Sequence, residues 1–180
     1  MFKTIVITKP SFFVGEAKAI VGLLDRGDID MLHLRKPGAA RDDVERLIRE
    51  IPREWHNRLV VHDHFSLAER YGLYGIHLNS RFPTPPYSWR GSVSRSCHSF
   101  EEVMEWKSRC DYVSLSPVFD SISKHGYASA FTAGEIAQAV DTGMIDDKVY
   151  ALGGVTFSRL AEVKDMGFGG AMILGDAWKG

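Results

Sequence analysis

The sequence has 180 residues, of which 44% are hydrophobic and 25% are charged, and its formal net charge is -1. That length suits one globular domain, so we expect a single domain over residues 1–180. The balanced charge gives no reason to expect binding to nucleic acid, and no apolar run approaches the roughly 18 residues of a membrane span.

The N-terminal residues and the two cysteines both indicate the compartment in which the protein is found. The first ten residues form too short an apolar run for a cleavable signal, and the run leads straight into Lys9-Pro10. The two cysteines, Cys97 and Cys110, lack the spacing of metal ligands and suit a reducing compartment. We therefore expect a cytoplasmic protein that binds neither nucleic acid nor a membrane.

Short runs of β-branched and apolar residues predict eight strands along the chain. Most of these runs end at a proline, a glycine or a polar residue. The predicted strands cover residues 2–8, 30–35, 58–63, 75–78, 92–97, 111–115, 148–152 and 170–174.

Helical spacing fills most of the gaps between these strands. Ala17, Ile20, Val21 and Leu24, for example, recur at i, i+3, i+4 and i+7, which gives one apolar helix face. The predicted helices cover residues 17–24, 44–51, 65–71, 100–104, 132–140 and 157–163.

Two positions in the alternation lack a full helix. The segment 80–91 contains three prolines, so we expect the fourth helix to be missing or one turn long. Only residues 176–180 follow the last strand, so the eighth helix should be truncated. The longest loop covers residues 116–131.

Strict alternation of strands and helices predicts right-handed crossovers and a parallel sheet. Eight units indicate a small, single (β/α)8 TIM barrel of the α/β class, with helices four and eight reduced. No GxGxxG motif follows the first strand, which argues against a dinucleotide-binding sheet.

Polar side chains gather at the ends of the predicted strands, which is where barrel enzymes carry their active sites. One alternative for each histidine is that it only caps a carbonyl group. Because the residues recur at strand after strand, we favour a common active-site mouth. They are His33, Arg35, His62, Asp63, His77, Asn79, Ser96 and His98, with Lys124 in the loop after the sixth strand.

Glycines follow the last two strands. Gly153-Gly154 comes after the seventh strand, and Gly175 comes after the eighth. Barrels often bind phosphate with these two loops and the start of a helix, because glycine lets the backbone approach an anion. The alternative is two tight turns, and we favour the phosphate site.

The chain resembles the thiamine phosphate synthase/TenI family, a set of small (β/α)8 barrels of thiamin biosynthesis. The resemblance runs nearly end to end and rests on LHLRKP, VVHDHFSLA, GIHL, SRSCHSFEEV, DYVSLSPVFDSISKHG and ALGGVTFSRLAEVKDMGFGGAMILG. It implies that a thiazole phosphate is bound by the backbone at Gly153, Gly154 and the Leu174-Gly175 turn.

The synthase branch of the family also binds an aminopyrimidine pyrophosphate with Mg2+. Its Gln-x-Arg-x-Lys pattern matches His33, Arg35 and Pro37 here, so the arginine is kept and the lysine is lost, although Lys36 is adjacent. Asp63 would be one Mg2+ ligand, but residues 79–82 lack the second carboxylate. The branch's serine and loop lysine match Ser96 and Lys124.

The TenI branch tautomerises a thiazole carboxylate phosphate without a metal. Its strand-five pattern matches residues 95–102, but its proton-transfer histidine is replaced by Pro117. A general acid/base needs a pKa near neutrality, which suits histidine. We therefore expect His33, helped by His62 or His98, to transfer the proton.

Several alternatives stay open beside these two activities. The barrel could bind a thiazole or thiamin phosphate without turnover, because such a protein would tolerate both motif departures. A phosphosugar isomerase would need a carboxylate at a strand end, and only Asp63 is available. We rank the family enzyme first, and a homo-oligomer is compatible with all of these readings.

Overall fold

The computed structural model describes residues 1–120 and 130–179. Its strands are hydrogen-bonded in chain order, β1 to β8, and close into a barrel. They are β1 (Lys3–Ile7), β2 (Met31–Leu34), β3 (Leu59–Val61), β4 (Gly75–Leu78), β5 (Ser92–Cys97), β6 (Tyr112–Leu115), β7 (Val149–Ala151) and β8 (Gly170–Ile173).

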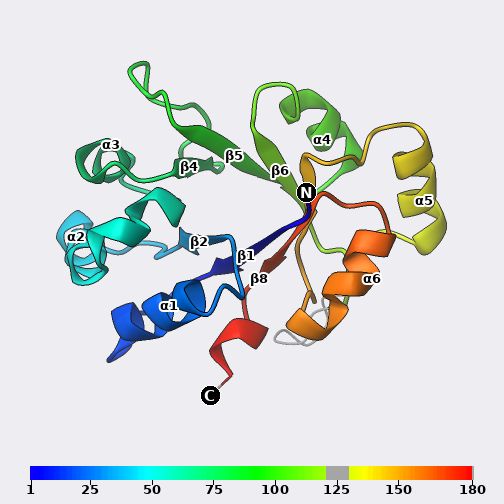
Figure 1. Ribbon diagram of the computed structural model, residues 1–180. Coiled ribbons are helices and arrows are strands. Elements are labelled where there is room, and N and C mark those ends of the chain that lie inside the picture. Colours follow the sequence, from blue (N-terminus) through cyan, green and yellow to red (C-terminus); the bar gives the residue numbers. More distant parts are fainter. Residues whose placement is uncertain (121–129, 180) are drawn as a thin grey trace. The chain divides into compact units, whose positions relative to one another are not determined.

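Helices alternate with these strands (Figure 1). The α-helices are α1 (Glu16–Asp25), α2 (Arg41–Glu50), α3 (Ser66–Tyr71), α4 (Phe100–Trp106), α5 (Ala133–Asp141) and α6 (Leu160–Asp165). The described residues also form short 3-10 helices, which are η1 (Arg53–Arg58), η2 (Phe157–Arg159) and η3 (Asp176–Trp178). No helix among the described residues is long and apolar enough to cross a membrane.

The predicted fold class is confirmed, including its two reduced helices. The segment between β4 and β5 contains no helix, and only η3 follows β8 within the described residues (Figure 1). Ser99 caps the start of α4, since its hydroxyl accepts a hydrogen bond from the Glu102 amide at 3.2 Å. The helix predicted over 157–163 differs: it starts as η2, and the Thr156 side chain caps no amide.

The chain packs as two compact units. One consists of Val6–Val93, and the other consists of Met1–Ile5 together with Ser94–Gly180. We call them the N-terminal unit and the C-terminal unit and describe each separately.

Parallel pairing of β2, β3 and β4 organises the N-terminal unit. Leu34 pairs with Val61, and Val61 pairs with Ile76. The apolar faces of α1 and α2 are buried in this unit, which explains the helical spacing in their sequences.

A buried ion pair joins the end of β2 to the start of α1. The Lys36 ammonium donates to Glu16 Oε1 at 2.6 Å and to the backbone carbonyls of Lys9 and Ser11 at 2.9 and 3.0 Å. Both side chains are almost fully buried. Burial raises the pKa of Glu16 and lowers the pKa of Lys36, and their mutual hydrogen bond opposes both shifts.

The C-terminal unit is built on β5 to β8, which pair in parallel. The rings of Tyr112 and Tyr150 stack with centroids 4.8 Å apart. Cys97 and Cys110 are both buried free thiols. Burial raises the pKa of Cys97 to about 12 and that of Cys110 to about 11.

Candidate active site

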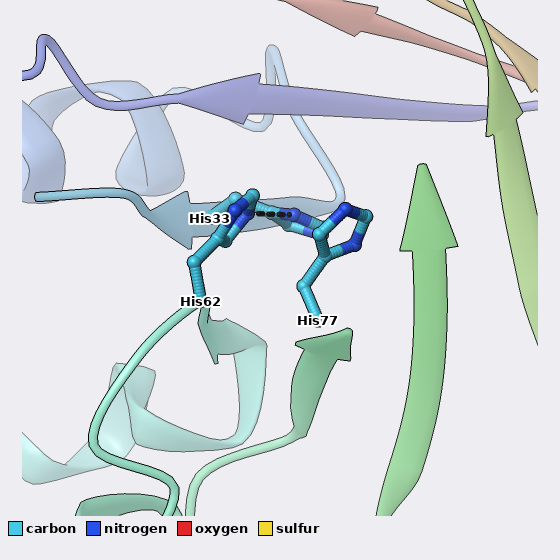
Figure 2. A group of neighbouring side chains, drawn as sticks. All are labelled: His33, His62 and His77. Atoms are coloured by element: carbon cyan, nitrogen blue, oxygen red, sulfur yellow. Dashed lines mark hydrogen bonds between the residues drawn. The ribbon is translucent and has the colours of Figure 1, made fainter. Parts of the chain in front are cut away.

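Three histidines from successive strands meet in the N-terminal unit (Figure 2). His33 lies in β2, His62 directly follows β3, and His77 lies in β4. The register pairs Val61 with Ile76, so one further step along both strands brings His62 beside His77. Parallel strands therefore place three imidazoles on one side of the sheet.

The contacts within this histidine cluster are close. His33 Nδ1 and His62 Nε2 share a hydrogen bond of 2.9 Å. The His62 and His77 rings stack with centroids 4.2 Å apart, and His33 packs edge-on against both. All three side chains are buried, with at most 6% of each residue exposed.

Burial keeps the first two of these imidazoles neutral. It lowers the pKa of His33 well below the usual value, and the neighbouring His77 lowers it further. The pKa of His62 is lowered well below its usual value by burial first and then by His77, His33, Arg35 and Arg81. Each neutral ring has one N–H donor and one lone pair, so the hydrogen-bonded pair can accept and return a proton. The lowered pKa values make both rings weaker bases than the near-neutral acid/base group that the sequence predicted.

Asp63 is occupied by an arginine from the next loop. The Arg81 guanidinium donates to its two carboxylate oxygens at 2.9 and 3.1 Å. Asn79 holds that loop in place: its amide donates to the His62 carbonyl at 2.8 Å, and its oxygen accepts from the Arg81 and Phe82 amides.

This arrangement does not fit the Mg2+ that the synthase branch implies. Mg2+ prefers several oxygen ligands in a near-octahedral arrangement. Asp63 is the one carboxylate present after β3 and β4, and Arg81 already neutralises it. The loop of residues 79–82 supplies no second carboxylate.

The two basic residues after β2 have different roles. Arg35 is half-buried, and its guanidinium forms no ion pair among residues 1–120 and 130–179. Its backbone is fixed by Thr8, whose hydroxyl accepts from the Arg35 amide at 2.9 Å. Lys36, in contrast, uses its ammonium within the Glu16 pair, so Arg35 is the cation of this segment that is available to an anion.

In the C-terminal unit, His98 lies beside the residue that precedes Pro117. Its Nδ1 is 3.2 Å from the Ser116 hydroxyl and 3.3 Å from the Ser116 carbonyl. The Ser116-Pro117 bond is cis. Ser96 lies on neighbouring β5, where its hydroxyl accepts from Ser114 at 3.4 Å. A histidine thus stays next to the position where Pro117 replaced the expected one.

The predicted phosphate glycines also lie in the C-terminal unit. Gly153 and Gly154 have positive φ angles of 90° and 63°. A Cβ on Gly154 would lie 2.4 Å from the Asp120 carbonyl oxygen, so only glycine fits there. Gly175 has an ordinary helical φ of -66° and follows Leu174 at the start of η3. Among the described residues, neither the Gly154 nor the Gly175 amide donates to a backbone carbonyl.

An acidic side chain lies among these amides. Asp176 accepts a hydrogen bond from the Phe157 amide at 3.0 Å, at the start of η2. That bond, followed by one from Lys179, lowers the Asp176 pKa. The Phe157 amide at the start of η2 is therefore already satisfied by a carboxylate, whereas the Gly154 and Gly175 amides donate to no backbone carbonyl within the described part of the chain.

The sequence prediction and the structure do not cover the same residues. Lys124 lies outside the described residues. His77 was among the strand-end residues that the sequence assigned to the active-site mouth, and the structure places it in the histidine cluster. Arg81, Ser116 and Asp176 were not among the candidate site residues. The Arg81 and Asp176 contacts depend on loop conformations that no sequence period encodes.

The barrel and its polar strand ends define a small (β/α)8 protein of the kind that carries an active site at the carboxyl ends of its strands. Comparison with known proteins narrows this class. The family model described as thiamine monophosphate synthase matches residues 4–175. The chain therefore belongs to the thiamine monophosphate synthase family.

Individual relatives agree with this assignment. A thiamine-phosphate synthase of Halalkalibacterium halodurans is 27% identical over 151 residues, which cover 78% of this chain and 70% of the relative. The crystal structure of a thiamine phosphate pyrophosphorylase from Bacteroides thetaiotaomicron is 47% identical, covers 98% of this chain and 85% of its own, and has a TM-score of 0.89. A Pyrococcus furiosus structure with the same name is 21% identical, with a TM-score of 0.73, and shows the fold alone.

The family resemblance and the assignment to an enzyme family of thiamine biosynthesis are thus confirmed. The roles of the individual site residues remain predictions.

Proposed function

We propose that the protein is a thiazole tautomerase, which converts a thiazole carboxylate phosphate to its aromatic form by proton transfer. The observation that carries this proposal is the 2.9 Å hydrogen bond between the buried His33 and His62. A tautomerisation needs a group that removes a proton from one ring atom and returns one to another. Two neutral, hydrogen-bonded imidazoles supply both the lone pair and the N–H.

The assignment of roles follows from this chemistry. The lone pair of the His33–His62 pair removes the proton, and an N–H of the same pair returns one, so no net proton is consumed. His98 is the reserve acid/base group beside Ser116. Arg35 pairs with the substrate carboxylate, because a guanidinium matches that group with two parallel hydrogen bonds.

The phosphate of the substrate is assigned to Gly153, Gly154 and the Leu174-Gly175 turn. The Gly154 and Gly175 amides support this assignment, because neither donates to a backbone carbonyl among residues 1–120 and 130–179. Ser96 and Lys124 complete the proposed anion contacts, and we expect Lys124→Ala to weaken phosphate binding without abolishing proton transfer. No cofactor is assigned to this reaction.

Thiamine-phosphate synthase is the second candidate, because the Halalkalibacterium halodurans relative carries that name and the 47% identical structure is named a thiamine phosphate pyrophosphorylase. This reaction would couple an aminopyrimidine pyrophosphate to the thiazole phosphate. In the family it uses Mg2+, for which Asp63 is the remaining carboxylate. The Arg81–Asp63 pair argues against that ion here.

One assay separates the candidates. The purified protein is incubated with thiazole carboxylate phosphate, with and without aminopyrimidine pyrophosphate and Mg2+, and the products are identified by mass spectrometry and NMR. Aromatised thiazole phosphate formed without Mg2+ supports the tautomerase. Thiamin phosphate formed only with Mg2+ and the pyrophosphate supports the synthase. Tight binding of thiazole phosphate with neither product would leave a non-catalytic binding protein.

The remaining expectations belong to the same proposal. We propose one domain over residues 1–180, a cytoplasmic protein, and small molecules rather than nucleic acid as its partners. A homo-oligomer is compatible with these assignments, and size-exclusion chromatography with light scattering measures the oligomeric state directly.

A further inference from the structure

We propose that His33, His62 and His77 form a binding site for a divalent transition-metal ion such as Zn2+ or Co2+. One nitrogen from each of the three rings lies within 4.8 Å of the other two (Figure 2). The site is distinct from the Mg2+ site that the family resemblance implies, because it contains no carboxylate.

The ligand chemistry selects the class of metal. Imidazole nitrogen binds Zn2+, Co2+, Ni2+ and Cu2+ well, whereas Mg2+ prefers oxygen. Three histidines with an open fourth position are a known arrangement for Zn2+ in proteins. The histidine cluster has this composition, with His33 in β2, His77 in β4 and His62 directly after β3.

The spacing requires only small rotations of the rings. Bonds of about 2.0–2.1 Å in a tetrahedral site put ligand nitrogens about 3.3 Å apart. The His33 Nδ1–His62 Nε2 pair is already at 2.9 Å, and the full group lies within 4.8 Å. A bound ion would replace this N–H···N hydrogen bond. The proton would move to the other nitrogen of its ring, so the His33–His62 pair stays neutral and releases no proton.

The surrounding charges bear on the fourth position. Arg81 is neutralised by Asp63, whereas Arg35 is unpaired among the described residues. A bound dication beside an unpaired guanidinium favours an anion as the fourth ligand. We therefore expect carboxylate or phosphate to strengthen binding of the metal, as the substrate class of the proposed function would.

Binding of the metal is tested on the full chain after treatment with a chelator. Co2+ is titrated in, and the visible absorption of the four-coordinate ion is recorded. We expect one equivalent of Co2+ per chain, displaced by Zn2+ and unaffected by excess Mg2+. His77→Phe keeps the packing against His62 but removes a ligand. Loss of a residue that only hydrogen-bonds to a metal ligand typically weakens metal binding roughly 10–100-fold. Because His77→Phe removes a ligand itself, it should weaken Co2+ binding at least that much.

A matched control is available in the same unit. His64 is half-buried and bonds to the Ala39 carbonyl, outside the cluster, at a φ of 56° that asparagine tolerates. His64→Asn should bind Co2+ as the wild type does. Equal Co2+ affinity in the wild type and His77→Phe, or no saturable binding in the wild type, would overturn the metal site. Zn2+ should also raise the thermal midpoint of the wild type but not of His77→Phe.

One consequence rests on the proposed function. A metal on the lone pairs of His33 and His62 removes the base, so Zn2+ should inhibit tautomerisation reversibly, and a chelator should restore it. The two hypotheses fail separately. If the chelator-treated protein binds Co2+ but never aromatises the thiazole, the tautomerase hypothesis is wrong. If the protein is an active tautomerase but does not bind Co2+, the metal site is wrong.

Discussion

At the scale of single residues, the site combines neutral histidines with a neutralised carboxylate. Buried imidazoles keep their lone pairs at physiological pH because burial disfavours the charged form. Asp63 already accepts from Arg81 through both carboxylate oxygens, so a metal ion would have to compete with that guanidinium. These two features favour proton transfer over the departure of pyrophosphate.

Substitution of Asp63 tests directly whether the reaction is a proton transfer that needs no metal ion. Asp63→Asn should change the tautomerase rate by less than about tenfold, since loss of a true acid/base group costs about 10²–10⁴-fold. Steady-state kinetics with thiazole carboxylate phosphate measure the difference. The opposite result would be a wild type that loses activity in a chelator and regains it when Mg2+ is added, while Asp63→Asn does not regain it. That result would assign Asp63 to a metal.

The two cysteines give a prediction on reactivity and pH. Because burial raises both thiol pKa values, to about 12 and about 11, neither Cys97 nor Cys110 should react with a disulfide reagent at pH 8 in the folded protein. Both should react after denaturation. Rapid labelling of either thiol in the native protein would contradict this prediction.

The same shifts set the sign of an alkaline effect on stability. The thiols ionise near 9.0 in the unfolded chain and at higher pH in the folded one. Their contribution to the free energy of unfolding is therefore fully present below pH 9.0 and is lost as the pH rises towards the folded values. Urea unfolding at several pH values measures this loss, and a stability that rose above pH 9 would contradict it.

At the scale of elements, the buried Lys36–Glu16 pair fixes α1 to the end of β2. Lys36→Met should destabilise the protein by about 3–5 kcal/mol, because it leaves the Glu16 carboxylate buried without its partner. The double variant Lys36→Met with Glu16→Leu should recover most of that loss. Chemical denaturation measures both, and equal stability of the single and double variants would contradict the pair's role.

The loops after β7 and β8 give a prediction on anion binding. Gly154→Ala should abolish phosphate binding, because its Cβ would collide with the Asp120 carbonyl and its φ is positive. Asp176→Asn should instead tighten binding, since it removes a negative charge near the Gly175 amide. Isothermal titration with a thiazole phosphate distinguishes the two effects. Unchanged affinity in Gly154→Ala would rule out this loop as the phosphate site.

At the scale of the whole molecule, the sequence predicted the barrel because its signals are local and periodic. Alternating apolar runs, the prolines of residues 80–91 and the short segment after β8 each fixed one element. Individual contacts were harder to predict. The alternation along β2 placed His33 and Arg35 on one side, but the sequence did not show that Lys36 turns inward to Glu16 or that Arg81 folds back onto Asp63.

The difference has a physical origin. Strand registers follow from hydrogen bonding and burial, which repeat every two residues. Ion pairs such as Arg81–Asp63 depend on a loop whose conformation is set by Asn79 accepting two amides. The segment of Lys124 lies outside the described residues, so its proposed anion contact rests on the sequence alone.

The measurement that tests the central claim most directly is the rate of aromatised thiazole formation by wild type and His33→Gln, both in the presence of a chelator. Glutamine keeps a hydrogen-bonding side chain but cannot transfer a proton. We predict turnover by the wild type without metal, a loss of about 10²–10⁴-fold in His33→Gln, and retained substrate binding in that variant. Wild-type turnover by His33→Gln would contradict the histidine relay, and full thiamin phosphate synthesis by that variant would identify the protein as a synthase.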